Sequence, residues 1–166
     1  MNIFRVAYTP IRCAQCLDDL RLNKMILETA QLLSTAVWHH APQQARLWGL
    51  YRPTHRNHPV TLWVKHSESN YRWTTDLLYH LLREREFRTN KTHATQIYLR
   101  RLTDGVEFIP WAKPIPSPNC SAYPEVEHFL AYRLTLRDKW VNDIRTPTWT
   151  KRGSPEWLKK ISDLDC

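Results

Sequence analysis

The sequence predicts an all-α protein: a compact single domain, residues 1–166, of four or five helices with long proline-rich loops. Apolar residues return at three- and four-residue steps through several stretches, which is the period of a helix buried on one side. Prolines stand between these stretches, five of them within residues 103–124, where they favour extended loops. The length of 166 residues is that of one ordinary domain.

The stretch Leu17–His39 is predicted to form the longest helix. It follows an apolar segment, Ile3–Ala7, and a turn at Tyr8–Pro10, and either Asp18 or Asp19 can cap its first turn. One face of this helix is expected to be buried against the rest of the chain. The apolar residues on that face are Leu20, Ile26, Leu27, Ala30, Leu33 and Val37.

A polar line on another face of the same helix holds a single acid. Glu28 shares that face with Arg21, Lys24, Gln31 and Thr35, which recur at helical spacing. One interpretation is a solvated face in which Lys24 and Glu28 form a weak ion pair one turn apart. The other is a carboxylate held among cations for chemistry, and the pattern alone leaves both open.

The loop Arg52–Pro59 separates this helix from the next. Its two prolines exclude helix, and it concentrates two histidines, two arginines and an asparagine, as loops that carry binding residues do. Residues Val60–Arg88 regain the helical period, and Ser67 or Ser69 can divide them by capping a second helix.

The second half of the chain has shorter predicted elements. A short helix is expected over Thr92–Leu102, and the prolines of Thr103–Pro124 indicate an ordered, extended loop. Another helix is expected over Glu125–Val141. A basic aromatic loop, Pro147–Gly153, follows it, and Ser154–Glu156 begins a last short helix.

The charge balance indicates a polyanionic partner. The chain has 24 Lys and Arg against 16 Asp and Glu, a net charge of +8, and its basic residues are spread along the whole length. Such an excess attracts polyanions, of which nucleic acid is the commonest. The 8 tryptophans and 7 tyrosines fit the same partner, because flat rings stack on unpaired bases, although most buried tryptophans only fill cores.

The cysteines and the first residues exclude other classes of protein. Cys13, Cys16, Cys120 and Cys166 predict no disulfide framework, and the Cys13–Cys16 spacing is half of a zinc motif that no second pair completes. The chain has no long apolar run and no signal-peptide pattern at its start. We expect a soluble monomer of the cytoplasm, or of the host cytoplasm if the source is viral, with no metal, cofactor or membrane partner.

Several segments together resemble the pyrimidine dimer DNA glycosylases of the endonuclease V type, which occur in phages and bacteria. The mark of that family is a helix near the N-terminus with a Leu, an Asp, a Leu and a catalytic Glu at fixed spacing. Residues 103–124 have no counterpart in the resemblance. The matching positions are Leu17, Asp19, Leu22 and Glu28, and the other similar segments are Met1–Phe4, Asn57–Pro59 and Pro147–Lys151.

The resemblance implies an enzyme that excises a damaged or modified base from duplex DNA, with or without AP-lyase cutting of the strand. In that family the chain's own α-amino group attacks the sugar C1′ and forms an imine. Catalysis is therefore assigned to Glu28 and to the terminal nitrogen of Met1 or Asn2, and an α-amine, with a pKa near ~8, is partly nucleophilic at neutral pH. The implied DNA-binding residues are Arg21, Lys24, Gln31, Arg56, His58, Trp149 and Lys151.

Other functions stay open on the sequence alone. Asn2 is not one of the small residues that usually permit removal of Met1, and a glycosylase that activates water with Glu28 as its base would not need the amine at all. A non-catalytic nucleic-acid-binding protein is the alternative that the composition also fits. A nucleosidase or glycosyl-transfer enzyme acting on nucleotides would use the same carboxylate chemistry.

Overall fold

The computed structural model describes residues 2–162 of the chain, the last three of them by their backbone alone. Within this part all regular structure is helical, which confirms the predicted fold class, but the helices outnumber the predicted four or five. None of the described helices is long and apolar enough to cross a membrane. The α-helices are α1 (Pro10–Cys16), α2 (Asp19–His40), α3 (Pro42–Leu47), α4 (Pro59–His66), α5 (Glu68–Thr89), α6 (Leu99–Asp104), α7 (His128–Val141) and α8 (Glu156–Ser162), and the 3-10 helices are η1 (Ala94–Tyr98) and η2 (Gly105–Phe108).

Two helices that the sequence did not predict, α1 and α3, begin at prolines, and so does the predicted helix α4. Pro10, Pro42 and Pro59 each stand in the first turn of a short helix, α1, α3 and α4 respectively. Proline fits this place because its ring already holds the helical φ and because the first N–H groups have no partner inside the helix. These prolines therefore start helices as well as end the preceding ones.

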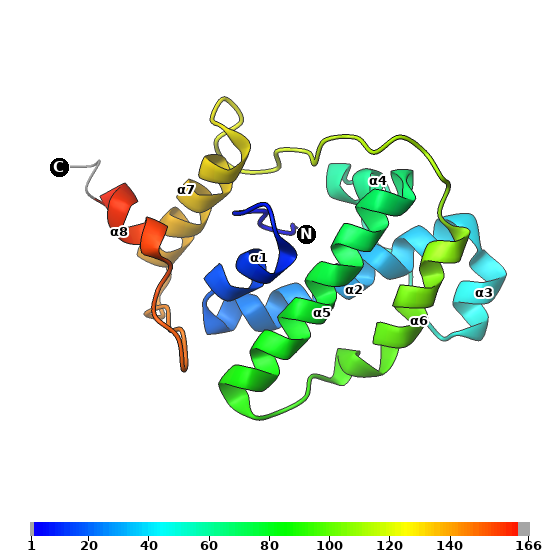
Figure 1. Cartoon of the computed structure of the whole chain (residues 1–166), viewed down its shortest axis with the longest axis horizontal. Helices are drawn as coiled ribbons and strands as arrows, with labels where there is room; N and C mark the ends of the chain where they lie inside the picture. Colours follow the sequence, from blue (N-terminus) through cyan, green and yellow to red (C-terminus); the bar gives the residue numbers. More distant parts are fainter. Residues whose placement is uncertain (1, 163–166) are drawn as a thin grey trace.

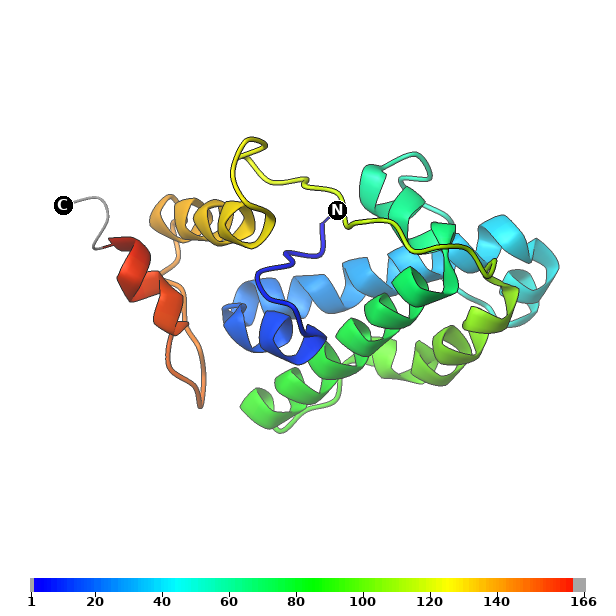
Figure 2. The ribbon, with the colours of Figure 1, turned by 45° about the horizontal axis from the view of Figure 1, so that its top comes forward.

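Two helices of 22 residues each, α2 and α5, form the centre of the molecule. Figures 1 and 2 show them packed side by side, with α1 against α5 and with α3, α4 and α6 gathered around the far end of α2. The helices α7 and α8 form a pair beside the start of α2. Ser67 caps α5 by accepting a hydrogen bond from Asn70 N, as the sequence predicted.

The predicted buried stripe of α2 was wrong at two positions. Leu20 and Leu27 are 46% and 39% exposed, whereas Leu22 and Met25 are buried. The core covers α2 from α5, α4 and α3, and buried residues of the segment before α1 belong to the same core, so a wider sector than one stripe is covered. Leu20 is left at the edge of a groove that opens along the remaining side of the helix.

The segment between η2 and α7 has no helix and returns the chain across the molecule. It is held to α4 by two hydrogen bonds, from Trp63 Nε1 to Ile115 O (2.9 Å) and between His66 Nε2 and Lys113 O (3.2 Å). It then passes the first residues of the chain before it enters α7, as Figures 1 and 2 show. Residues far apart in the sequence meet there.

A buried arginine at the end of α5 ties the core together. The Arg88 side chain has no exposed area and donates to Glu84 Oε1 (2.8 Å) and Asp19 Oδ1 (3.0 Å). It also donates to the carbonyls of Leu17 (2.8 Å) and Gln15 (3.1 Å), which lie at the junction of α1 and α2. These bonds hold the α1–α2 junction against α5.

Replacement of Arg88 by methionine is expected to lower the free energy of unfolding by about 3–5 kcal/mol, because it leaves carboxylates and carbonyls without their buried partner. Urea unfolding measures this loss. Arg100, which is 94% exposed, provides the control: the same substitution there should change the stability by less than about 0.5 kcal/mol. A loss below about 1 kcal/mol for Arg88→Met would contradict the structural role given to it.

Candidate active-site groove

Glu28 lies on the side of α2 that faces the first residues of the chain. Its Oε2 accepts a hydrogen bond from the backbone nitrogen of Asn2 at 3.1 Å, and its Oε1 is 3.6 Å from Lys24 Nζ. The carboxylate side chain is 15% exposed, and it lines an open groove of about 470 Å³. The ion pair that the sequence suggested is thus present, and the same carboxylate also contacts the N-terminal segment.

The first residues are bent back onto α2 by a tight turn at Phe4. This residue has a positive φ of 38°, its ring is buried, and Val6 N donates to Phe4 O at 2.8 Å. The ring packs edge-on against Tyr132 of α7. A buried anchor at Phe4 therefore fixes the direction in which the chain reaches Glu28.

The opposite wall of the groove comes from the proline-rich segment and α7. Asn2 Nδ2 donates to Cys120 O at 3.1 Å, and Ala122 N donates to Thr135 Oγ1 of α7 at 3.0 Å. Cys120, Ala122, Thr135 and Lys139 all line the groove, and the sequence analysis assigned none of them to it. Thr135 and Lys139 lie one turn apart on a predicted helix, and this spacing was the only feature of the sequence that could have placed them at one site. The segment around Cys120 gave none.

The predicted DNA-binding residues of α2 have unlike settings. Arg21 lines the groove, but its guanidinium is held by Asp18 (3.1 Å) and by Asp143 (2.8 Å) and is only 13% exposed. Lys24 is 67% exposed at the same groove. Gln31 lies one turn further along α2 and is half-buried. Lys24 is thus the more available cation beside Glu28.

The two predicted residues of the loop 52–58 are also placed near α2. His58 caps α4 through its Nδ1, which accepts from Val60 N at 3.2 Å. Partial burial lowers the pKa of His58, and His55 acts in the same direction while Glu28 opposes it. Arg56 lines a separate hollow further along α2 and is not part of the Glu28 groove.

The predicted clamp residues of the tail do not reach the Glu28 groove. Trp149 Nε1 donates to Cys16 O at 3.0 Å, and Lys151 Nζ donates to Phe87 O and Asn90 Oδ1, both at 2.8 Å. These bonds fasten the tail to α1 and α5. Their contact with DNA stays a prediction. Met1, the other predicted catalytic residue besides Glu28 and Asn2, lies outside the described residues.

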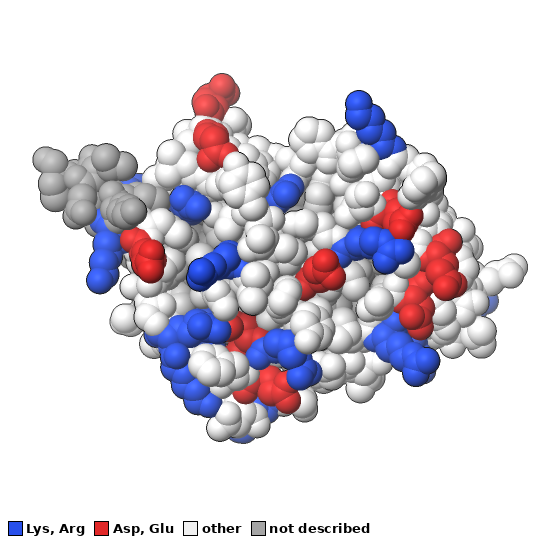
Figure 3. All heavy atoms as spheres, in the orientation of Figure 1, with Lys and Arg blue, Asp and Glu red and all other residues white. Residues whose placement is uncertain are grey.

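The excess positive charge is not gathered into one continuous surface on the face shown in Figure 3. Lys and Arg are interspersed there with Asp and Glu, and broad uncharged areas lie between them. The ion pairs Arg72–Glu68 and Arg83–Glu86 of α5 are examples of opposite charges that lie side by side in this protein. On this face the positive charge is therefore distributed in small groups rather than in one basic surface.

The comparison with known families agrees with this geometry. A family model described as pyrimidine dimer DNA glycosylase matches residues 1–97, more than half of the chain, and so covers the N-terminal segment, α2 and Glu28. The chain therefore belongs to the pyrimidine dimer DNA glycosylase family, of the endonuclease V type. Comparison with curated proteins and with solved structures gives no match. Membership of this family makes the protein a DNA glycosylase in class, with DNA as its substrate.

His58, which caps α4, is expected to make the stability of the protein depend on pH. Because the pKa of His58 is lowered in the folded protein, its neutral form is favoured on folding. Its contribution to stability is complete above the ordinary histidine pKa of about 6.5 and is lost as the pH falls through that value to the lowered one. His58→Asn should keep the cap, because asparagine is a good N-cap residue, but lose this pH dependence.

Urea unfolding at pH 7.5 and pH 5.5 tests the role of His58. The native protein is expected to lose more stability between these two pH values than His58→Asn. His58→Ala, which has no cap, should be less stable than the native protein by about 1 kcal/mol at pH 7.5. Equal pH dependence in the native protein and His58→Asn would contradict the assignment.

Proposed function

We propose that this protein is a pyrimidine dimer DNA glycosylase with AP-lyase activity, whose nucleophile is the α-amino group of its own first residue. The observation that carries the proposal is the hydrogen bond of 3.1 Å between Asn2 N and Glu28 Oε2 at the groove. This bond supports an arrangement in which the terminal amine works beside the carboxylate. The amine is that of Asn2 if Met1 is removed, and otherwise that of Met1, one residue further.

The first chemical step joins the protein to the sugar. The lone pair of the amine forms a bond to C1′ while the bond from C1′ to the damaged base breaks, and the base leaves with that electron pair and takes up a proton. The amine then loses a proton, the bond from C1′ to the ring oxygen opens, and a C1′ imine results. Loss of a proton from C2′ then expels the 3′ phosphate by β-elimination.

Glu28 serves two purposes in this proposal. As a carboxylate it stabilises the positive charge that develops on the sugar as the base leaves. It then takes up the proton that the amine loses, gives that proton to the ring oxygen and finally accepts one from C2′, so a single carboxyl group acts as base, acid and base in turn. Lys24 Nζ is 3.6 Å from Glu28 Oε1 and lies where a flanking phosphate would pass.

The shape of the groove favours a polymer over a free nucleotide. The groove is open along α2 and its walls come from four separate segments, so a strand can lie in it. A nucleosidase would be expected to enclose its small substrate. A protein that only bound DNA would have no use for a carboxylate at the centre of its binding surface, because an acid repels phosphate.

Replacement of Glu28 by glutamine is expected to lower the rate of base release from duplex DNA containing a pyrimidine dimer by at least about 100-fold, because the amide cannot transfer protons or balance the developing charge. Affinity for the same duplex should be unchanged or higher, since one negative charge is lost. Glu107→Gln, the same change at an exposed site on η2, is the control. Unchanged single-turnover rates in Glu28→Gln would contradict the catalytic role.

Reduction with borohydride during the reaction tests the amine. We expect a covalent protein–DNA adduct, and peptide mapping should place it on the N-terminal residue. A variant with several residues added before Met1 moves the amine away from Glu28 and should lose the adduct while it keeps the fold. An adduct on a lysine would overturn the proposed nucleophile, and base release with no adduct would instead favour water activated by Glu28.

A further inference from the structure

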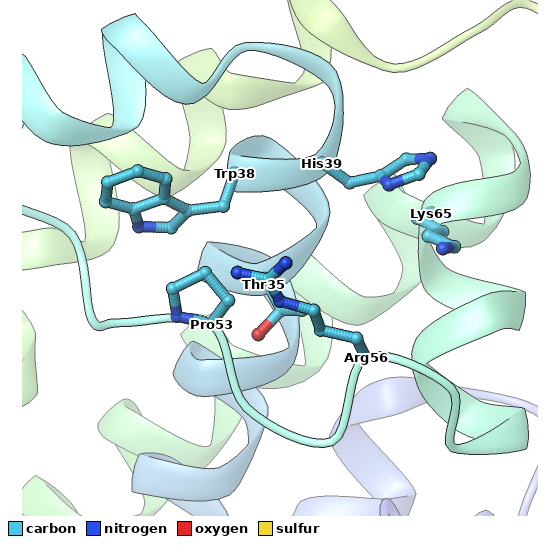
Figure 4. Close-up of a pocket in the computed structure, with 6 residues that line it drawn as sticks. All are labelled: Thr35, Trp38, His39, Pro53, Arg56 and Lys65. Carbon is cyan, nitrogen blue, oxygen red and sulfur yellow. The ribbon is translucent and has the colours of Figure 1, made fainter.

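A second hollow lies further along α2, at its C-terminal end. Figure 4 shows the six residues that line it, which come from α2, the loop 52–58 and α4. Its volume is about 50 Å³, enough for a few water molecules or one small ion and too little for a base or a nucleoside. The lining residues are Thr35, Trp38, His39, Pro53, Arg56 and Lys65.

The walls of the hollow are fastened to one another. Thr54 N donates to Thr35 Oγ1 at 3.1 Å, and Thr35 Oγ1 in turn donates to Gln31 O at 2.8 Å, so the loop is pinned to a buried residue of α2. On the other side, His40 Nε2 is 2.9 Å from Lys65 O, which joins the end of α2 to α4. The cations of the hollow are therefore presented by a frame that is held in place.

Three basic side chains from three different elements surround this small space. His39 comes from α2, Arg56 from the loop and Lys65 from α4. Burial lowers the pKa of His39, and Lys65, His40 and Arg56 add to the effect. Among the side chains that the structure describes, no carboxylate forms an ion pair with Arg56 or Lys65, the two cations of the hollow. Positive charge is thus concentrated without an internal counter-charge.

The hollow also has a hydrogen-bond donor with nothing to bind. The indole nitrogen of Trp38 is buried and has no acceptor among the described residues. In Figure 4 this nitrogen is on the edge of the ring that faces Pro53. A buried N–H group without an acceptor is uncommon and calls for a partner. The donor, like the cations, suits an anion that carries several oxygen acceptors.

We propose that this hollow binds one backbone phosphate of the DNA strand whose damaged nucleotide lies at Glu28. Arg56 and Lys65 neutralise the phosphate charge, and the Trp38 indole donates to one of its oxygens. The separation fits: Thr35 is seven residues beyond Glu28 on the same face of α2, about 10.5 Å at a rise of 1.5 Å per residue. Along the axis of a DNA duplex that is about three base-pair steps, at about 3.4 Å each. The choice of DNA as the ligand rests on the function proposed above.

Inorganic phosphate tests the hollow by itself. In NMR spectra of the ¹⁵N-labelled full chain at constant ionic strength, added phosphate should shift the indole N–H of Trp38 and the ring signals of His39 in a saturable manner. Lys65→Gln and Arg56→Gln should each weaken this binding. Arg100→Gln, which removes a cation from the exposed surface of α6, should leave it unchanged. Absence of a saturable shift at Trp38 in the native protein would overturn the proposal.

The salt dependence of DNA binding tests the number of phosphates. Each phosphate neutralised on duplex DNA contributes about 0.9 to the slope of log K against log salt. If Arg56 and Lys65 share one phosphate, the double variant should lose about 0.9 in total, little more than either single variant. A loss of about 1.8 would mean two separate surface contacts, and no loss would mean no contact. Either result overturns the shared site.

The two proposals fail in different ways. If phosphate binds at Trp38 and the salt slope falls as expected, but Glu28→Gln retains full rates, the phosphate site is supported and the catalytic role of Glu28 is wrong. If Glu28→Gln is inactive while phosphate shifts no NMR signal of the hollow, the catalytic role of Glu28 is supported and the proposed phosphate site is wrong. Both variants at the hollow replace exposed or half-buried side chains, and their NMR spectra report directly that they are folded.

Discussion

The buried guanidinium of Arg88 is the interaction on which the rest of the structure depends. A charge without any exposed area is tolerated only when its donors are satisfied, and Arg88 satisfies them with two carboxylates and two carbonyls. The two carbonyls lie at the junction of α1 and α2, so the position of that junction is set by α5. Arg88 therefore holds the first residues of α2 in place, and the rotation of the helix about its axis, which decides the direction of each side chain, follows from that position.

Asp19 extends this constraint to the other end of the sequence. Its carboxylate accepts from Arg88 and also from the hydroxyls of Thr148 (2.8 Å) and Thr150 (2.7 Å), and Asp19 N donates to Thr148 O at 2.8 Å. Burial raises the pKa of Asp19, but these hydrogen bonds outweigh it and hold the pKa below its usual range. The aspartate of the N-terminal motif and the Pro-Thr-Trp segment of the tail are separate in the sequence, and in the structure they contact each other beside the start of α2.

The groove at Glu28 and the hollow at Thr35 lie on the same face of α2. Glu28, beside the backbone nitrogen of Asn2, stands at the groove, and Thr35 stands two turns further at the hollow lined by Arg56 and Lys65. A rigid helix holds the two at a constant separation, which is what a polymer with regularly spaced charges requires. In the function proposed above, Glu28 acts where the sugar reacts, and Arg56 and Lys65 bind a phosphate of the same strand. This separation of roles explains how a carboxylate can sit within the binding surface for a polyanion.

The sequence by itself determined the helical class, the approximate extent of the two long helices and a capping serine before α5, either Ser67 or Ser69, because periodicity and capping are local properties of the chain. The choice of Glu28 as a catalytic residue came from the family resemblance and stays a prediction. It misjudged Leu20 and Leu27, since which sectors of a helix are covered depends on its neighbours. Only the tertiary structure decided that Asn2 meets Glu28, that the segment around Cys120 forms the facing wall, and that Trp38 and Lys65 share a hollow with Arg56. These contacts join residues that are 26 to 118 positions apart in the sequence or that lie on separate elements. The packing of the helices brings such residues together, and the spacing of residues along the chain does not predict it.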